Sequence, residues 1–157
     1  MILVTLGTQK FEMNRLIQAA DELAQTVSEE IFVQCGNSSY QPKHCKYSAF
    51  VDTTQFAKMI QECSVLITHS GVGTIMTGIQ AKRPIVVVPR LKKYNEHVDD
   101  HQLQIAEAFE EQGCVLCCRE VAELKQYIEK AKSFAFQPYT APESKVENLI
   151  LDFIEKN

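Results

Sequence analysis

The sequence predicts an α/β protein that forms a single doubly wound domain around a parallel sheet. Short apolar runs alternate along the chain with longer segments whose apolar residues recur at helical spacing. Parallel strands require crossover connections of that length. The residues Ile-Val-Val-Val at 85–88 are apolar on both faces, as in a central strand that helices cover on both sides. A length of 157 residues suits one such domain.

The first half of the chain is expected to supply three strands and two helices. Its strands are short apolar runs that end near turn-forming residues, and its helices carry apolar residues three and four positions apart. Asp52 can cap the second helix, because an aspartate side chain accepts a hydrogen bond from the first helical amides. In chain order, these elements are the strand 2–6, the helix 11–27, the strands 31–34 and 47–51, and a helix that runs through residue 60.

The second half continues the alternation. One strand feeds a glycine-rich turn that opens a helix, and a polar loop at 90–95 follows the central strand. Gly113 can cap the end of the next helix. In chain order, the expected elements are the strand 65–68, the helix 71–81, the strand 84–89, the helix 97–113, the strand 115–118 and the helix 121–132.

The alternating pattern ends near residue 133. Residues 1–133 are expected to form the main part of the domain, whereas residues 134–157 hold a proline-bearing connector and a last helix of the same domain. That helix, expected at 144–155, carries its apolar residues on one stripe. The stripe is expected to pack on its own domain, and docking on a partner is the alternative.

Composition and charge exclude several classes of protein. The net charge is −4, whereas broad nucleic-acid binding needs a basic surface. No apolar run approaches the ~20 residues that cross a bilayer, and no signal peptide opens the chain, so a cytoplasmic protein is expected. The six cysteines are then expected to be core thiols. Metal or redox chemistry at Cys114 and Cys117, which have Cys-x-x-Cys spacing, is the alternative.

The sharpest functional signal is the glycine-rich turn after the strand 65–68. The sequence Thr-His-Ser-Gly-Val-Gly-Thr at 68–74 leads into a helix N-terminus, whose unpaired amides and dipole favour an anion. Glycines let the backbone approach a phosphate, and Ser70 or Thr74 can add a hydroxyl donor. The pattern is neither a Walker P-loop nor the dinucleotide pattern Gly-x-Gly-x-x-Gly. A tight turn that only needs glycine dihedral angles is the alternative.

A second polar cluster occupies residues 90–102. Arg90 directly follows a buried strand, where its guanidinium could reach a diphosphate, and Asp100 and Gln102 offer groups that bind sugar hydroxyls. His97 and His101 are four residues apart and are expected to share a helical face. Ligand contact or acid–base chemistry is favoured there over a zinc site. A solvated loop with a charged helix start is the alternative.

These motifs resemble the nucleotide-sugar-binding half of GT-B glycosyltransferases of family 28, over almost the whole chain. The chain looks most similar to the small catalytic subunits of two-component transferases. These include bacterial exopolysaccharide and capsule subunits and the cytosolic subunit of the eukaryotic enzyme that adds the second GlcNAc to dolichol-linked GlcNAc. The resemblance implies a Rossmann-like fold. It rests on residues 4–8, 50–51, 67–74, 82–90 and 96–102.

The resemblance also implies roles for the matched residues. Phe50 and Val51 would lie beside the uracil of a UDP-sugar, and Gly7 and Thr8 would face the acceptor phosphates. Thr77 stands where larger members of the family often carry a ribose-binding glutamate, and it offers one hydroxyl instead. The diphosphate would be bound by Ser70, Gly71, Val72, Gly73 and Thr74, and the donor sugar by Asp100, His101 and Gln102.

A complete GT-B enzyme has two such domains, and a chain of this length supplies one. The resemblance therefore implies a hexosyltransferase that needs a membrane-anchored, acceptor-binding subunit and acts on a lipid-linked saccharide at the inner face of the membrane. The helix amides would stabilise the UDP leaving group. The general base is expected in the partner or, in this chain, at Glu96 or His97; no cofactor or metal is expected.

Two other functions remain open from the sequence. A non-catalytic subunit that binds a nucleotide-sugar, or enhances another enzyme, would use the same glycine-rich turn. A UDP-sugar epimerase on the same scaffold needs both domains in one chain, so the length of 157 residues weighs against it.

Overall fold

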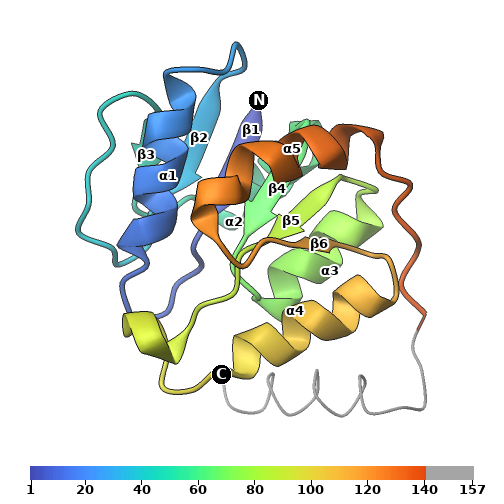
Figure 1. Cartoon of the computed structure of the whole chain (residues 1–157). Helices are drawn as coiled ribbons and strands as arrows, with labels where there is room; N and C mark the ends of the chain where they lie inside the picture. Colours follow the sequence, from blue (N-terminus) through green and yellow to red (C-terminus); the bar gives the residue numbers. More distant parts are fainter. Residues whose placement is uncertain (141–157) are drawn as a thin grey trace.

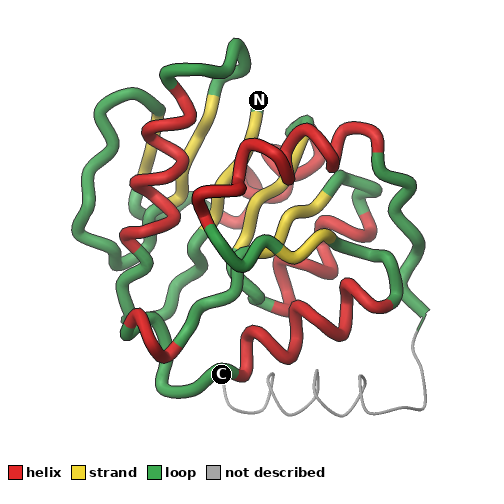
Figure 2. The backbone as a smooth tube through the Cα atoms, viewed as in Figure 1, coloured by secondary structure: helices red, strands yellow, loops and turns green. Residues whose placement is uncertain are grey.

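The computed structural model describes residues 1–140 and shows a sheet with helices on both faces (Figure 1). Strands and helices alternate along the described chain, joined by loops, except that β2 leads to β3 through a loop without a helix (Figure 2). The strands are β1 (Ile2–Thr5), β2 (Ile31–Gln34), β3 (Lys46–Ser48), β4 (Val65–Thr68), β5 (Ile85–Val87) and β6 (Leu116–Cys117). The α-helices are α1 (Asn14–Ala24), α2 (Thr53–Glu62), α3 (Val72–Gln80), α4 (His101–Glu111) and α5 (Leu124–Ser133).

The six strands of the described sheet are all parallel and lie in the order β3-β2-β1-β4-β5-β6. β1 pairs with β2 on one side and with β4 on the other, so that Val4 lies between Val33 and Ile67. The strand order reverses between β1 and β4, and the loops that leave these two strands lead to helices on opposite faces. Such a point opens a crevice at the carboxyl ends of the strands. The predicted doubly wound, Rossmann-like fold is confirmed.

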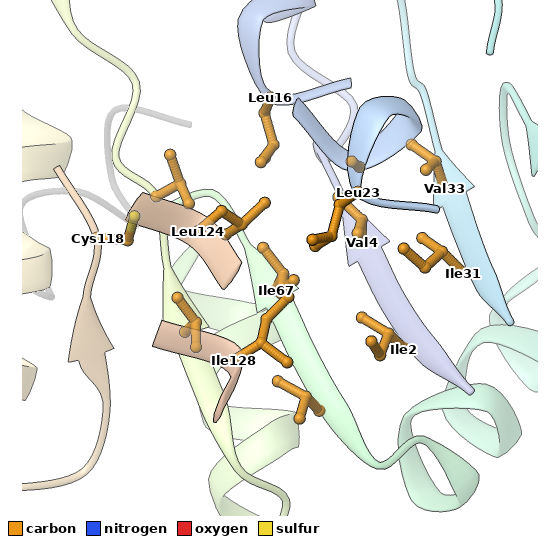
Figure 3. Packing of buried hydrophobic residues seen from close by; sticks show 14 of the residues in the cluster. Ile2, Val4, Leu16, Leu23, Ile31, Val33, Ile67, Cys118, Leu124 and Ile128 are labelled. Atoms are coloured by element: carbon orange, nitrogen blue, oxygen red, sulfur yellow. The ribbon is translucent and has the colours of Figure 1, made fainter. Parts of the chain in front are cut away.

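Two apolar cores hold the helices on the sheet. α1 and α5 cover one face, where side chains from β1, β2 and β4 meet Leu16, Leu124 and Ile128 (Figure 3). α2, α3 and α4 cover the other face. Successive residues of a strand point to opposite faces, so Leu3 enters one core and Val4 the other. This double coverage explains why the strands other than the exposed edge strand β3 are apolar at nearly every position.

The elements predicted within residues 1–133 are present, with ends that differ by a few residues. Asp52 caps α2 as expected, because its Oδ1 accepts a hydrogen bond from the Gln55 amide at 2.9 Å. The predicted polar loop at 90–95 contains a short 3₁₀-helix (Lys92–Tyr94), and the helix predicted at 121–132 opens with another (Val121–Glu123). The helix expected at 144–155 lies outside the described residues.

The largest difference concerns the helix predicted at 97–113, which begins only at His101. Residues before it are loop, and Asp99 Oδ1 accepts hydrogen bonds from the ring Nδ1 of His97 and from the His101 amide, both at 3.0 Å. His97 therefore lies outside the helix, and the expectation that His97 and His101 share a helical face is wrong. The local carboxylate contacts stabilise the loop in place of a further helical turn.

The cysteines lie in the apolar interior. Cys45 is partly exposed, and the other five are buried free thiols. Burial raises the pKa of Cys63 to about 11 and that of Cys117 to about 12, so these thiols stay protonated at neutral pH. Within residues 1–140, no group of three His, Cys, Asp or Glu side chains could hold a metal ion. No helix in that range is long and apolar enough to cross a bilayer.

Candidate functional site

A cleft of about 290 Å³ lies at the carboxyl ends of the strands, at the β1–β4 crevice. It is formed by the loop after β1, the residues that follow β3, and the turn from β4 into α3. The sequence-predicted residues that the structure brings together here are Gly7, Thr8, Phe50, Val51, Gly71, Val72, Gly73 and Thr74. The lining residues that sequence reasoning did not assign to the site are Thr5, Gln9, Gln34, Phe56 and His69.

The N-terminus of α3 opens into this cleft. Gly71 is its N-cap, and no side chain caps the helix there, so the first helical amides remain available to a ligand. A Cβ built on Gly73 meets no atom within 4 Å, which shows open space beside the backbone at the second residue of the helix. These features suit an anionic group that lies directly against the helix N-terminus.

Gly7 and Gly71 both lie against the Nε2–Cε1 edge of the His69 imidazole. Gly7 has a φ of +75°, and a Cβ on it would overlap Nε2 of His69. A Cβ on Gly71 would come within 2.7 Å of the same nitrogen. Both positions therefore need glycine, for backbone conformation at Gly7 and for space at both. The imidazole consequently borders the cleft with Nε2 close to the backbone of Gly7 and Gly71.

Gln34, the last residue of β2, holds the loop after β1 in place. Its side-chain oxygen accepts hydrogen bonds from the Gly7 amide at 3.1 Å and from the Thr5 hydroxyl at 2.6 Å. Its side-chain nitrogen donates to the carbonyls of Gly7 at 3.1 Å and Ala49 at 2.8 Å. Polar residues at the ends of otherwise apolar strands, such as Thr5 and Gln34, were the sequence signal that could have identified this part of the site.

His69 is buried and uncharged at neutral pH. Burial, and then the nearby charge of Arg90, lower the pKa of His69 from 6.5 to about 3. Its Nδ1 lies 3.2 Å from Nε2 of the Gln102 side chain. The imidazole therefore contributes hydrogen-bonding groups to the cleft without a positive charge of its own.

The lowered pKa of His69 predicts a pH-dependent stability. Between pH 6.5 and pH 3 the unfolded chain binds a proton at this residue and the folded chain does not, so stability falls as the pH falls. The expected loss from His69 between pH 7 and pH 5 is about 2 kcal/mol. Urea unfolding at these two pH values measures it, and the His69→Gln variant should show a flatter pH dependence. Equal slopes in the two proteins would contradict the assignment.

Arg90 does not line the cleft, which corrects the expectation that its guanidinium reaches a diphosphate. The side chain is only 1% exposed. Its Nη2 donates to the Leu6 carbonyl at 2.6 Å, and its Nη1 donates to the carbonyls of Phe11 and Glu96 at 2.7 and 3.2 Å. Burial lowers the pKa of Arg90 to about 10, which leaves it charged at neutral pH. The guanidinium thus ties the loops after β1 and β5 together from behind the site.

Glu96 is also a structural residue, which corrects the expectation that it acts as the general base. Its carboxylate is 2% exposed and accepts two hydrogen bonds from Arg15, from Nε and Nη2, each at 3.0 Å. It also accepts one from the Leu91 amide at 3.2 Å. A carboxylate that is buried and paired in this way is shielded from a substrate in the cleft. His97 lies in the same loop, partly exposed, with its ring against Phe11.

The three residues expected to contact the donor sugar are placed differently from one another. Asp100 is exposed, and its Oδ1 accepts a hydrogen bond from the Lys92 amide at 2.9 Å. His101 is partly exposed at the start of α4. Gln102 is fully buried and bonded within the protein, so the expectation of a direct sugar contact from Gln102 is corrected. None of the three belongs to the set of residues that line the cleft.

Two hydroxyl groups near the cleft also differ from expectation. Ser70 is buried beneath the turn and does not line the cleft. Thr77 is exposed on α3, and its hydroxyl donates to the Gly73 carbonyl at 2.8 Å. Of the hydroxyl donors predicted in this turn, Thr74 is the one that lines the cleft.

Comparison with known proteins identifies relatives of this fold and sequence. The chain matches the glycosyltransferase family 28 C-terminal domain over residues 1–155. A UDP-N-acetylglucosamine–N-acetylmuramyl-(pentapeptide) pyrophosphoryl-undecaprenol N-acetylglucosamine transferase of Prochlorococcus marinus (strain MIT 9312) is 35% identical over 46% of this chain and 21% of its own length. The human UDP-N-acetylglucosamine transferase subunit ALG13 is 25% identical over 74% of this chain and 11% of its own length. The chain thus spans about a fifth or less of these two relatives.

Solved glycosyltransferase structures share the fold. The calicheamicin glycosyltransferase CalG4 superposes with a TM-score of 0.66 at 17% identity, over 98% of this chain and 38% of its own. An NMR structure of ALG13 gives a TM-score of 0.56 at 17% identity, over 98% of this chain and 96% of its own. MurG from Acinetobacter baumannii gives 0.53 at 21% identity, over 98% of this chain and 49% of its own. The fold is therefore that of one domain of a GT-B glycosyltransferase.

Proposed function

The chain belongs to the glycosyltransferase family 28 C-terminal domain family, and from this we propose that it binds a UDP-sugar as the donor-binding subunit of a hexosyltransferase. The observation that carries the proposal is the uncapped N-terminus of α3 at the mouth of a cleft. Its free amides suit the diphosphate of the donor. As the sugar leaves, negative charge grows on the UDP oxygens, and fixed amides stabilise that charge without reorganisation.

The two sides of the cleft suit the uracil of the donor and the acceptor, respectively. Phe50, Val51 and Phe56 supply apolar surface on one side, and we assign the uracil to that side. Gly7 and Thr8 border the cleft on the β1 side, and we assign them to the acceptor side. Asp100 and His101 stay candidates for the donor sugar, because both retain exposed surface at the start of α4.

We further propose that the acceptor is a lipid-linked saccharide, in exopolysaccharide or capsule synthesis, and that a membrane-anchored subunit binds it. The name of the Prochlorococcus relative describes transfer to a pyrophosphoryl-undecaprenol carrier, and human ALG13 is named as a subunit. The loop after β5 exposes Tyr94 and Val98, the latter by 63%, which supports a partner on this side. The chain would then work at the inner face of the membrane through that partner.

The general base is the part of the mechanism that this cleft does not supply. None of its lining residues carries a carboxylate, and Glu96 is paired with Arg15. His97 remains the candidate within the described chain, because its ring is partly exposed and its Nδ1 is oriented by Asp99. A base from the acceptor-binding subunit is the other source, and the transfer assay with a His97→Gln variant separates the two.

The lack of a carboxylate in the cleft favours one second candidate function. The chain would then be a non-catalytic subunit that binds a nucleotide-sugar or enhances a partner enzyme. Under this alternative, variants that abolish UDP binding leave the sugar-transfer rate of the reconstituted complex unchanged. Under the main proposal they abolish it.

The main proposal is tested by binding and by transfer. Calorimetry with UDP, a panel of UDP-sugars and the matching ADP compound as control should show binding of the uridine compounds. Transfer of labelled sugar to a lipid-linked acceptor should require both this chain and the partner. Absence of UDP binding by the folded protein, alone and with the partner, would overturn the proposal.

A further inference from the structure

Gln102 connects the loops that follow β4 and β5. It lies in the first turn of α4 and is fully buried. Its side-chain oxygen accepts hydrogen bonds from the Ser70 amide at 3.2 Å and from the Arg90 amide at 2.9 Å. Ser70 belongs to the glycine-rich turn, and Arg90 follows the central strand, so one side chain holds both loops against the helix.

These two contacts determine which way the amide of Gln102 faces. Two backbone N–H groups can only be met by its oxygen, so its NH₂ group is on the other side, 3.2 Å from Nδ1 of His69. An NH₂ group donates and does not accept. Nδ1 must therefore carry a lone pair, and the proton of the neutral imidazole resides on Nε2.

Nε2 lies beside the two glycines that border the cleft. Nε2 is the atom nearest to a Cβ built on Gly7, and it also lies close to one built on Gly71. His69, Gly7 and Gly71 all line the cleft. An Nε2–H group at this place donates a hydrogen bond to an anionic oxygen, whereas the opposite tautomer would present a lone pair and repel it.

We propose that Gln102 is a positioning residue, which fixes the neutral His69 imidazole with its proton on Nε2 and so turns it into a hydrogen-bond donor for the ligand. The ligand side of this proposal rests on the proposed binding of a nucleoside diphosphate. The role differs from the direct sugar contact expected from the sequence, because Gln102 acts through His69. The charge of Arg90 disfavours protonation of the ring and so supports the neutral state.

The Gln102→Glu variant tests the proposal with little change of shape. One carboxylate oxygen can still accept from the Ser70 and Arg90 amides, but the other replaces a donor by an acceptor and pulls the proton onto Nδ1 of His69. We expect UDP affinity to fall about tenfold or more. Gln104, exposed on the same helix, provides the control, and Gln104→Glu should bind UDP as the unmodified protein does.

The decisive measurement is long-range ¹H–¹⁵N NMR of the histidine rings in the ligand-free full chain. We expect His69 to show a protonated Nε2 and an unprotonated Nδ1, and the Gln102→Glu variant to show a protonated Nδ1. A protonated Nδ1 in the unmodified protein overturns the proposal, whether or not the variant folds. Since this readout needs no ligand, it can succeed even if UDP binding, and with it the proposed function, fails.

A double-variant cycle separates positioning from a merely structural role. In a His69→Gln background, the Gln102→Glu change should cost little further UDP affinity, because the group through which Gln102 acts is already gone. Additive losses from the two changes would show that Gln102 acts on the ligand by another route, and they would contradict the proposal.

Discussion

Replacing Gly73 by aspartate should abolish UDP binding, with a loss of affinity of a hundredfold or more, and should leave the fold intact. A Cβ at this position meets no neighbour within 4 Å, so the side chain enters the open space beside the start of α3. A carboxylate in the first turn of a helix is favourable for the helix itself. It occupies the place proposed for the diphosphate, however, and repels it at close range.

Two further variants at Gly73 identify the cause of the loss. Gly73→Asn has nearly the same size without charge, and Gly73→Ala should raise the free energy of unfolding by about 0.5–1 kcal/mol. Calorimetric titration with UDP and urea unfolding measure both effects. We expect Gly73→Ala to bind best, Gly73→Asn less well and Gly73→Asp not at all. UDP affinity that is unchanged in Gly73→Asp would show that the diphosphate binds elsewhere.

Replacing Arg90 by leucine should destabilise the fold by about 3–5 kcal/mol, because several buried carbonyl oxygens lose their hydrogen-bond donor at a cost of about 1–3 kcal/mol each. The carbonyls of Leu6, Phe11 and Glu96 would all lose their donor. The pair of Glu96 with Arg15 would remain but would no longer be anchored beneath the site. Chemical unfolding of the purified protein measures the change.

The same variant distinguishes the two interpretations of Arg90. Lys92 is exposed in the neighbouring 3₁₀-helix, and Lys92→Leu should change the free energy of unfolding by less than about 0.5 kcal/mol. If Arg90→Leu unfolded at the same urea concentration as the unmodified protein but bound UDP weakly, the guanidinium would be a diphosphate ligand, as the sequence first indicated. If Arg90→Leu is less stable but its folded fraction binds UDP as tightly as the unmodified protein, the result supports the structural role of Arg90.

The sheet and the glycine-rich turn could be predicted because local patterns decide them. The bounds of β2 and β4 agree with the predicted strands at 31–34 and 65–68, since each run is apolar and turn residues follow it. The turn into α3 was predictable for the same reason, because glycines and a following helical pattern occur next to one another. What was predicted least well is the segment 90–102, where tertiary contacts override local pattern.

That segment has many charged residues, and a charged segment is usually exposed to solvent. Arg90 and Glu96 are buried nonetheless. Glu96 pairs at 3.0 Å with Arg15, which is distant in sequence, and the Arg90 guanidinium donates to the carbonyls of Leu6 and Phe11. Gln102 likewise finds its partners across the fold, at Ser70 and His69. Pairings between distant residues leave no periodic signal in one sequence, so the loop residues that support the cleft were mistaken for residues that line it.

The adjacency of β1 and β4 has a consequence for how the protein acquires its native state. These central strands are separated by about 60 residues of chain, so the two sides of the proposed nucleotide site meet only after a non-local pairing, which is typically slow. Partly folded molecules therefore lack this site. A nucleotide that binds only the folded protein shifts the folding equilibrium toward the folded state. A nucleotide-sugar bound at the proposed site would therefore stabilise the folded chain in addition to serving as the proposed donor.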